Sequence, residues 1–285
     1  MTAATPALPS APLWLVTNPA SGSNSPAATR AVSAALAAAG CPPARVIDAA
    51  AGLPDRAALE AAGVGVLAVF TGDGTINAVA AALEGWGGAL LPLPGGTANL
   101  LARALHGDDP ADTIAARLPR LVPTRRTCVR TGHGPALAEV LAGPGATWSD
   151  VREGLRDGAV ADIAGAAVSA IRQSTVGPMV ALDDPSLGKA EGYAGIRLAP
   201  GPRGLIVAGY GAESIGDYLA QGLALLRRNF REGPHEPLGE HARVTCRSLE
   251  AAPIPLMIDG ERRDGSPTER FSLAPFALDL LGSGA

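Results

Sequence analysis

The stretch VFTGDGTIN, residues 69–77, joins the end of an apolar run to the beginning of a helical pattern. Residues 64–70 are apolar and rich in β-branched side chains, which is typical of a strand buried on both faces of a parallel sheet. Apolar residues then recur at helical spacing behind Thr75, which we expect to be the N-cap. Two glycines permit close backbone approach, and Asp73 lies between them. We therefore expect an anion or metal site where this strand ends.

Taken alone, the same residues also describe a tight strand-to-helix turn in which Asp73 is only a capping residue. A second stretch, residues 89–103, favours the functional interpretation because it repeats the order of apolar strand, glycine turn and helix. Its turn contains Gly95 and Gly96, and Thr97 is the expected N-cap. Ligands of open α/β sheets bind outside the carboxyl ends of the strands, so both loops should face one crevice.

The composition excludes several classes of protein. The 285 residues suffice for about two domains, and a hydrophobic content of 47% excludes a disordered chain. A net charge of -4 argues against nucleic acid as the main partner. The three cysteines are far apart in the sequence and favour neither disulfides nor a zinc site. We find no signal peptide pattern and no apolar run long enough to span a bilayer, and therefore expect a cytoplasmic protein.

The order of strand-like and helix-like segments predicts two domains. Up to about residue 118 they alternate, which predicts an α/β domain with a parallel sheet over residues 1–122. Residues 123–285 should form a β-rich, antiparallel, sandwich-like domain, and whether the last strand returns to the first domain stays open. Its expected strands lie within residues 136–141, 179–182, 195–198, 204–207, 243–246, 254–258 and 277–280, and its expected helices within residues 159–172 and 215–231.

Three further features have alternative interpretations. The arginines at positions 117, 120, 125, 126 and 130 favour a solvated hinge over an anion site. The helix expected at residues 215–231 carries leucines and a basic end, a pattern found both on anionic membranes and in core-facing helices. Asp259-Gly260-Glu261 follows an apolar strand and, taken alone, is a common hairpin turn.

Four motifs together resemble the diacylglycerol kinase catalytic domain family, the soluble lipid kinases that include the sphingosine kinases. They are Asn18-Pro19-x-Ser21-Gly22, Gly72-Asp73-Gly74-Thr75-x-Asn77, Pro94-Gly95-Gly96-Thr97-Ala98-Asn99-x-x-Ala102-Arg103 and Asp259-Gly260-Glu261. The resemblance implies a nucleotide-binding domain similar to that of NAD kinases, joined to a β-rich lipid-binding domain. Three positions depart from the family's pattern: Thr71 stands for a glycine, Leu100 for an acidic residue and Arg203 for an aspartate.

The resemblance also implies roles for individual residues. ATP should be bound by Asn18, Ser21, Gly22, Gly72, Gly74, Thr75, Asn77, Gly96, Thr97, Asn99 and Arg103. The implied metal is Mg²⁺, with Asp73 and Asp259 as its candidate ligands. The implied catalytic residues are Asp73, Glu261 and Asp259, and whether Asp73 or Glu261 is the base stays open.

The implied activity is transfer of the γ-phosphate of ATP to a hydroxyl of a diacylglycerol-like or sphingoid-like lipid, in phospholipid metabolism. The lipid would be presented at a membrane surface, so the protein would be cytoplasmic or peripheral at the membrane, and a homodimer stays open. Two alternatives remain: a kinase of a soluble substrate such as NAD, which shares the Gly-Asp-Gly loop, and a catalytically silent nucleotide- or lipid-binding protein.

Overall fold

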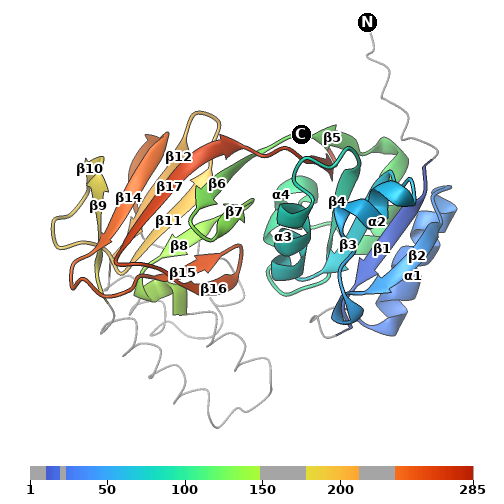
Figure 1. The fold of residues 1–285 in the computed structure, drawn as a ribbon, viewed down its shortest axis with the longest axis horizontal. Helices are drawn as coiled ribbons and strands as arrows, with labels where there is room; N and C mark the ends of the chain where they lie inside the picture. Colours follow the sequence, from blue (N-terminus) through green and yellow to red (C-terminus); the bar gives the residue numbers. More distant parts are fainter. Residues whose placement is uncertain (1–10, 20–23, 148–177, 212–234, 285) are drawn as a thin grey trace, which may run out of the picture. The chain divides into compact units, whose positions relative to one another are not determined.

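A computed structural model describes residues 11–19, 24–147, 178–211 and 235–284 (Figure 1). The chain divides into two compact units, one of residues 1–126 with 275–285 and one of residues 127–274. The sequence placed the boundary after residue 122, whereas the structure places it after Arg126. The last strand belongs to the sheet of the first unit.

The first unit contains one six-stranded sheet in the order β2-β1-β3-β4-β18-β5. β2, β1, β3, β4 and β18 pair in parallel, and β18 pairs with β5 in antiparallel fashion. β1 and β3 are buried along their whole length, as expected for strands with helices on both faces. The predicted α/β class is confirmed. The strands are β1 (Leu13–Thr17), β2 (Pro43–Asp48), β3 (Val66–Thr71), β4 (Ala89–Pro94), β5 (Val122–Thr124) and β18 (Asp279–Gly282).

The helices of the first unit start where short polar residues or glycines end a loop. Ser25 caps α1 by accepting a hydrogen bond from the backbone N–H of Ala28 at 3.1 Å. Apolar side chains of α1 and α5 pack on β1, β3 and β4 and form one core. The helices are α1 (Pro26–Ala38), α2 (Arg56–Ala61), α3 (Asp73–Ala82), α4 (Leu100–His106) and α5 (Ala111–Ala116), with short 3-10 turns η1 (Ala49–Ala51) and η2 (Leu118–Arg120).

Two predicted N-caps are wrong. The N-cap of α3 is Gly72, not Thr75, because the chain turns into the helix directly after β3 ends at Thr71. The N-cap of α4 is Asn99, not Thr97, and its backbone is left-handed with φ 52°. Threonine is a good N-cap by propensity, but here the packing of the loops decides where each helix begins.

The arginines around the boundary behave as surface residues. Arg117 pairs with Asp109 at 2.5 Å and Arg125 pairs with Asp279 at 2.8 Å, and all four side chains are at least one third exposed. Exposed pairs of this kind contribute little to stability. This favours the solvated surface over an anion site for these two arginines.

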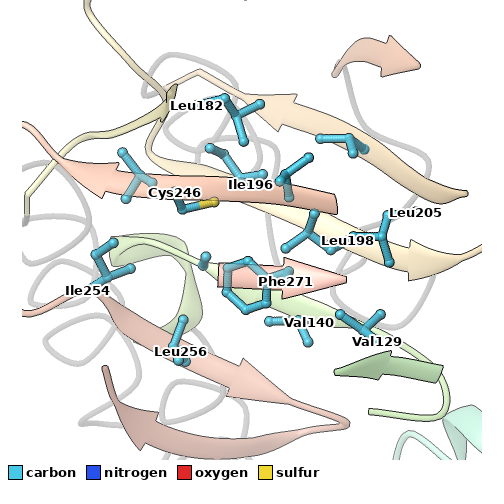
Figure 2. Close-up of a cluster of buried hydrophobic side chains, with 14 of the residues drawn as sticks. Val129, Val140, Leu182, Ile196, Leu198, Leu205, Cys246, Ile254, Leu256 and Phe271 are labelled. Carbon is cyan, nitrogen blue, oxygen red and sulfur yellow. The ribbon is translucent and has the colours of Figure 1, made fainter. Parts of the chain in front are cut away.

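The second unit contains two six-stranded sheets, in the orders β10-β9-β14-β17-β6-β7 and β13-β12-β11-β8-β15-β16. Figure 2 shows their shared core, where Cys246 and Phe271 of the first sheet and Val140 and Ile196 of the second all belong to one buried cluster. Burial alternates along β14, which is the pattern of a strand with one face in the core. The predicted β-rich unit is therefore present.

The strands of this unit differ in detail from the prediction. The single strand expected at residues 136–141 is two strands separated by residues 137–139, and several strands were missed, among them β6, β13, β16 and β17. The helices expected at residues 159–172 and 215–231 lie outside the described residues. The strands are β6 (Thr127–Thr131), β7 (Gly134–Ala136), β8 (Val140–Ala142), β9 (Val180–Asp184), β10 (Ser186–Leu187), β11 (Gly195–Pro200), β12 (Leu205–Tyr210), β13 (Glu236–His241), β14 (Arg243–Ser248), β15 (Pro255–Ile258), β16 (Glu261–Asp264) and β17 (Thr268–Pro275), with a short turn η3 (Pro144–Thr147).

A buried histidine joins α4 to the end of β18 in the first unit. His106 is 6% exposed, and its Nδ1 lies 2.9 Å from the Ser283 hydroxyl. Burial lowers the pKa of His106 from 6.5 to about 4, with Arg117 adding to the effect and Asp109 opposing it. The folded protein therefore holds this histidine neutral at pH values where the unfolded chain protonates it.

We predict that His106 makes stability fall as the pH falls from about 6.5 towards 4. The unfolded state binds up to one more proton in this window, so the free energy of unfolding should drop by at most about 1.4 kcal/mol per pH unit from this group. Urea unfolding followed by tryptophan fluorescence at pH 7.5, 6.0 and 5.0 measures the slope. His106→Gln should flatten it, while the exposed His235→Gln control should keep it. Equal slopes in wild type and His106→Gln would contradict the prediction.

Candidate active site

The first glycine loop places a carboxylate on the first turn of α3. Gly72 is the N-cap, with extended backbone and no side-chain cap hydrogen bond, and Asp73 is the first helical residue. Glycine has no side chain, so the cap residue makes no side-chain hydrogen bond to the first turn of the helix. The N–H groups of this turn carry the positive end of the helix dipole, which favours an anion.

The two glycine loops touch backbone to backbone at the ends of β3 and β4. A Cβ added at Gly96 would lie 2.6 Å from the Cα of Gly72, and one at Gly95 would lie 2.8 Å from the backbone nitrogen of Thr71. Gly95 also donates a backbone hydrogen bond to the Thr71 carbonyl at 3.1 Å. Glycine is needed at 95 and 96 for this contact, whatever ligand the loops hold.

Asp73 connects the two helices that begin at these loops. Its Oδ1 accepts a hydrogen bond of 2.5 Å from the backbone N–H of Leu100, the first residue of α4. Leu100 stands where the family resemblance led us to expect an acidic side chain, and its backbone makes this contact. The hydrogen bond fixes the orientation of the Asp73 carboxylate at the edge of the sheet.

Asn99 closes the second loop on itself. Its Oδ1 accepts from the Gly96 N–H at 2.8 Å, and its Nδ2 donates to the Gly96 carbonyl at 3.0 Å. Asparagine tolerates the left-handed backbone found here better than most residues do. The side chain thus shapes the loop, and its predicted contact with ATP stays a prediction.

The other predicted nucleotide ligands of the first unit lie near these loops or on the surface. Asn18 follows β1, Gly74, Thr75 and Asn77 lie on α3, and all four are half-buried. Thr97 is exposed, and Arg103 forms an exposed pair with Asp108 at 2.6 Å. Ser21 and Gly22 lie outside the described residues.

Sequence reasoning missed Asn24, a buried residue directly before α1. Its Nδ2 donates to the carbonyl of Phe70 in β3, and its Oδ1 accepts from the Thr29 hydroxyl at 3.1 Å. Asn24 therefore ties the start of α1 to the strand that leads into the first glycine loop. The only signal in the sequence is an amide next to the Ser-Pro helix start.

In the second unit, Asp259 and Gly260 form the two-residue turn between β15 and β16. Ile258 pairs with Glu261, and both turn residues have positive φ, 46° and 87°, which corresponds to a type I′ hairpin. Asp259 is 3% exposed. Its carboxylate accepts hydrogen bonds from the backbone N–H groups of residues 137–139, at 2.6, 2.9 and 2.8 Å.

Glu261 is placed differently from Asp259. It is the first residue of β16, an edge strand whose residues are all exposed. Its carboxylate lies 3.9 Å from a guanidinium nitrogen of Arg263, and both side chains are about half exposed. An exposed carboxylate at a strand end is accessible to a substrate hydroxyl.

The residues present fit a Mg²⁺ ion only if a bound nucleotide supplies some of its ligands. Within the described ranges, no three His, Cys, Asp or Glu side chains come together as a metal site. Mg²⁺ usually keeps several waters and binds one or two carboxylates together with substrate phosphates, so Asp73 is a sufficient protein ligand. The hydrogen bonds to Asp259 favour a different role for that residue.

We predict that Gly96→Ala destabilises the first unit, because the new Cβ would meet the backbone of Gly72 at 2.6 Å. Overpacking of this kind costs about 1–3 kcal/mol, which urea unfolding would measure. Gly87→Ala is the matched control, since a Cβ there meets nothing within 4 Å. Equal stability of the two variants would show that the loops do not need this close contact.

The comparisons with known proteins agree with this geometry. The family model of the diacylglycerol kinase catalytic domain matches residues 12–126, which include both glycine loops. A comparison with curated proteins finds no match.

Solved structures from Bacillus anthracis str. Sterne are similar over nearly the whole chain. One is a diacylglycerol kinase, 16% identical, with a TM-score of 0.59 over 95% of this chain and 96% of that chain. Another, described as a candidate diacylglycerol kinase, is 15% identical, with a TM-score of 0.59 over 99% of this chain and 98% of that one. At such identities the likeness shows the fold, which both units share with these proteins. Over residues 12–126, the chain is similar to the diacylglycerol kinase catalytic domain family.

Proposed function

We propose that this chain is an ATP-dependent lipid kinase that transfers the γ-phosphate of ATP to a hydroxyl of a diacylglycerol-like or sphingoid-like lipid. The observation that carries the proposal is the family match across both glycine loops, where Asp73 is held at the start of α3. The solved structure of a diacylglycerol kinase has the same fold over 95% of this chain.

The first unit supplies what phosphoryl transfer needs from a protein, which is mainly positioning and charge stabilisation. The first turn of α3 carries the positive end of the helix dipole, which favours phosphate oxygens. The glycine contact and the Asn99 hydrogen bonds keep the second loop in one conformation, so little ordering is needed when ATP binds. When Mg²⁺ is bound with ATP, it supplies positive charge at the phosphates, and Asp73 is the residue that would hold it.

The two candidate bases differ in what already contacts them. Asp73 accepts the Leu100 N–H at 2.5 Å, which stabilises its charged form and suits a metal ligand. Glu261 is exposed at the start of β16 and is accessible to an acceptor hydroxyl. We therefore propose Glu261 as the base that takes the proton of the lipid hydroxyl, and Asp73 as the ligand.

The proposed substrate lies in a membrane, so the enzyme would work at the membrane surface. Among the described residues, no helix is long and apolar enough to cross a bilayer. The proposal therefore involves peripheral contact with the lipid.

The test is transfer of labelled γ-phosphate from ATP with Mg²⁺ into a total lipid extract, with a parallel reaction on NAD without lipid. We expect one labelled lipid, which mass spectrometry would identify. Asp73→Asn and Glu261→Gln should each lower the rate by about 100-fold or more. Asp112→Asn, an exposed residue on the first turn of α5, is the matched control and should keep the activity.

Three results would contradict the proposal. Label in NAD but in no lipid would identify a kinase of a soluble substrate. Nucleotide binding without turnover on any lipid would identify a silent binding protein. Full activity of Asp73→Asn would remove the role proposed for that residue.

A further inference from the structure

We infer that Asp259 is a positioning residue: its buried carboxylate clamps the segment of residues 137–139 to the β15–β16 turn and thereby holds Glu261 in place. The significance of Glu261 rests on the function proposed above, whereas the clamp itself is a property of the fold.

The turn alone does not explain a buried carboxylate. A type I′ turn needs residues that accept positive φ, and Asn-Gly satisfies this requirement as well as Asp-Gly does. The side chain of a hairpin turn is usually in water, yet Asp259 is 3% exposed. Burying a charge is costly unless hydrogen bonds compensate for it.

The compensation comes from a segment more than a hundred residues away in the sequence. Leu137, Ala138 and Glu139 donate their backbone N–H groups to the carboxylate at 2.6, 2.9 and 2.8 Å. The backbone N–H of Asp259 donates in return to the Glu139 carbonyl at 2.9 Å. Hydrogen bonds to a charged acceptor are stronger than those between neutral groups, so the three bonds to the carboxylate form a firm connection, to which the fourth adds.

The clamp acts where the hairpin has least other support. β15 pairs with β8 through Ile258 and Val140, whereas β16, among the described residues, pairs with β15 alone and forms the edge of its sheet. All residues of β16 are exposed, so core packing does not hold Glu261. Beyond the pairing and burial of Ile258, the tip of the hairpin is therefore fixed through Asp259.

The clamped segment is itself anchored on a third strand. The carboxylate of Glu139 accepts a hydrogen bond of 2.7 Å from Nε of Arg197 in β11, and both side chains are at most one quarter exposed. Residues 137–139 are thus held on two sides. They form a rigid base against which Asp259 positions the turn.

The structure therefore separates the two acidic residues of the Asp-Gly-Glu motif. A metal ligand would need free oxygen lone pairs directed at the ion, whereas three N–H donors surround the Asp259 carboxylate. Asp259 holds the turn, and Glu261 does the proposed chemistry. If Asp259 were a metal ligand, replacing it would raise the Mg²⁺ concentration needed for activity, whereas replacing a positioning residue would not.

The test compares Asp259→Asn with wild type in the full chain, with Asp264→Asn, an exposed acid at the far end of β16, as the matched control. Asparagine keeps the shape of the side chain but places an N–H₂ group against N–H donors. Amide hydrogen exchange at residues 137–139 should speed up by about tenfold or more in Asp259→Asn and stay unchanged in Asp264→Asn. Slow and equal exchange in all three proteins would overturn the clamp.

Kinetics then test positioning against metal binding. Misplacing a reacting group by about 1 Å can cost about 100-fold, so kcat of Asp259→Asn should fall 10- to 100-fold, while KM for ATP and the Mg²⁺ concentration for half activity stay unchanged. In the double variant Asp259→Asn with Glu261→Gln, the loss in kcat should be smaller than the product of the two single losses. A raised Mg²⁺ requirement, or losses that multiply, would overturn the inference. If no lipid is phosphorylated but exchange responds as expected, the proposed function fails and the clamp stands.

Discussion

The first unit depends on the close contact between two backbones at the ends of β3 and β4. The Cα of Gly72 and the backbone of Gly96 approach so closely that no side chain fits at position 96. Because parallel strands bring their carboxyl ends to one edge of the sheet, this contact brings together the two loops that precede α3 and α4. The hydrogen bond from Leu100 to Asp73 follows from it, since the start of α4 reaches the start of α3 only when the loops touch.

The sequence was sufficient to predict features that depend on local patterns. The strands that lead into the two glycine stretches follow from their apolar runs, and the structure has them as β3 and β4. The glycines at 95 and 96 indicated the correct loop, and the structure supplies a reason for them, since a Cβ at either position would meet the backbone of residues 70–72. A glycine pattern predicts that the backbone lies close to another group, and only the structure identifies that group.

What sequence reasoning missed depends on contacts between distant segments. Thr75 and Thr97 have the propensity of N-caps, but the helices begin at Asp73 and after Asn99 because the loops pack together. The strand expected at residues 136–141 is interrupted because residues 137–139 turn their N–H groups to Asp259. The exposed strand β16 has no apolar alternation, so nothing local predicts it. Its existence follows from the type I′ turn that precedes it.

Asp73 and Asp259 have similar neighbours in the sequence but different surroundings in the structure. Each lies next to glycine at the end of a buried strand, and the resemblance gave both a role with metal. Asp73 is half-buried at the start of a helix, where an anion is favoured, and it accepts an N–H bond from Leu100. Asp259 is buried in a β-hairpin, and hydrogen bonds from three N–H groups compensate for the burial of its carboxylate. A proton acceptor must be both accessible and fixed. In the mechanism that we propose, the Asp-Gly-Glu motif meets the two requirements with separate residues, since the buried Asp259 fixes the turn and Glu261 is exposed.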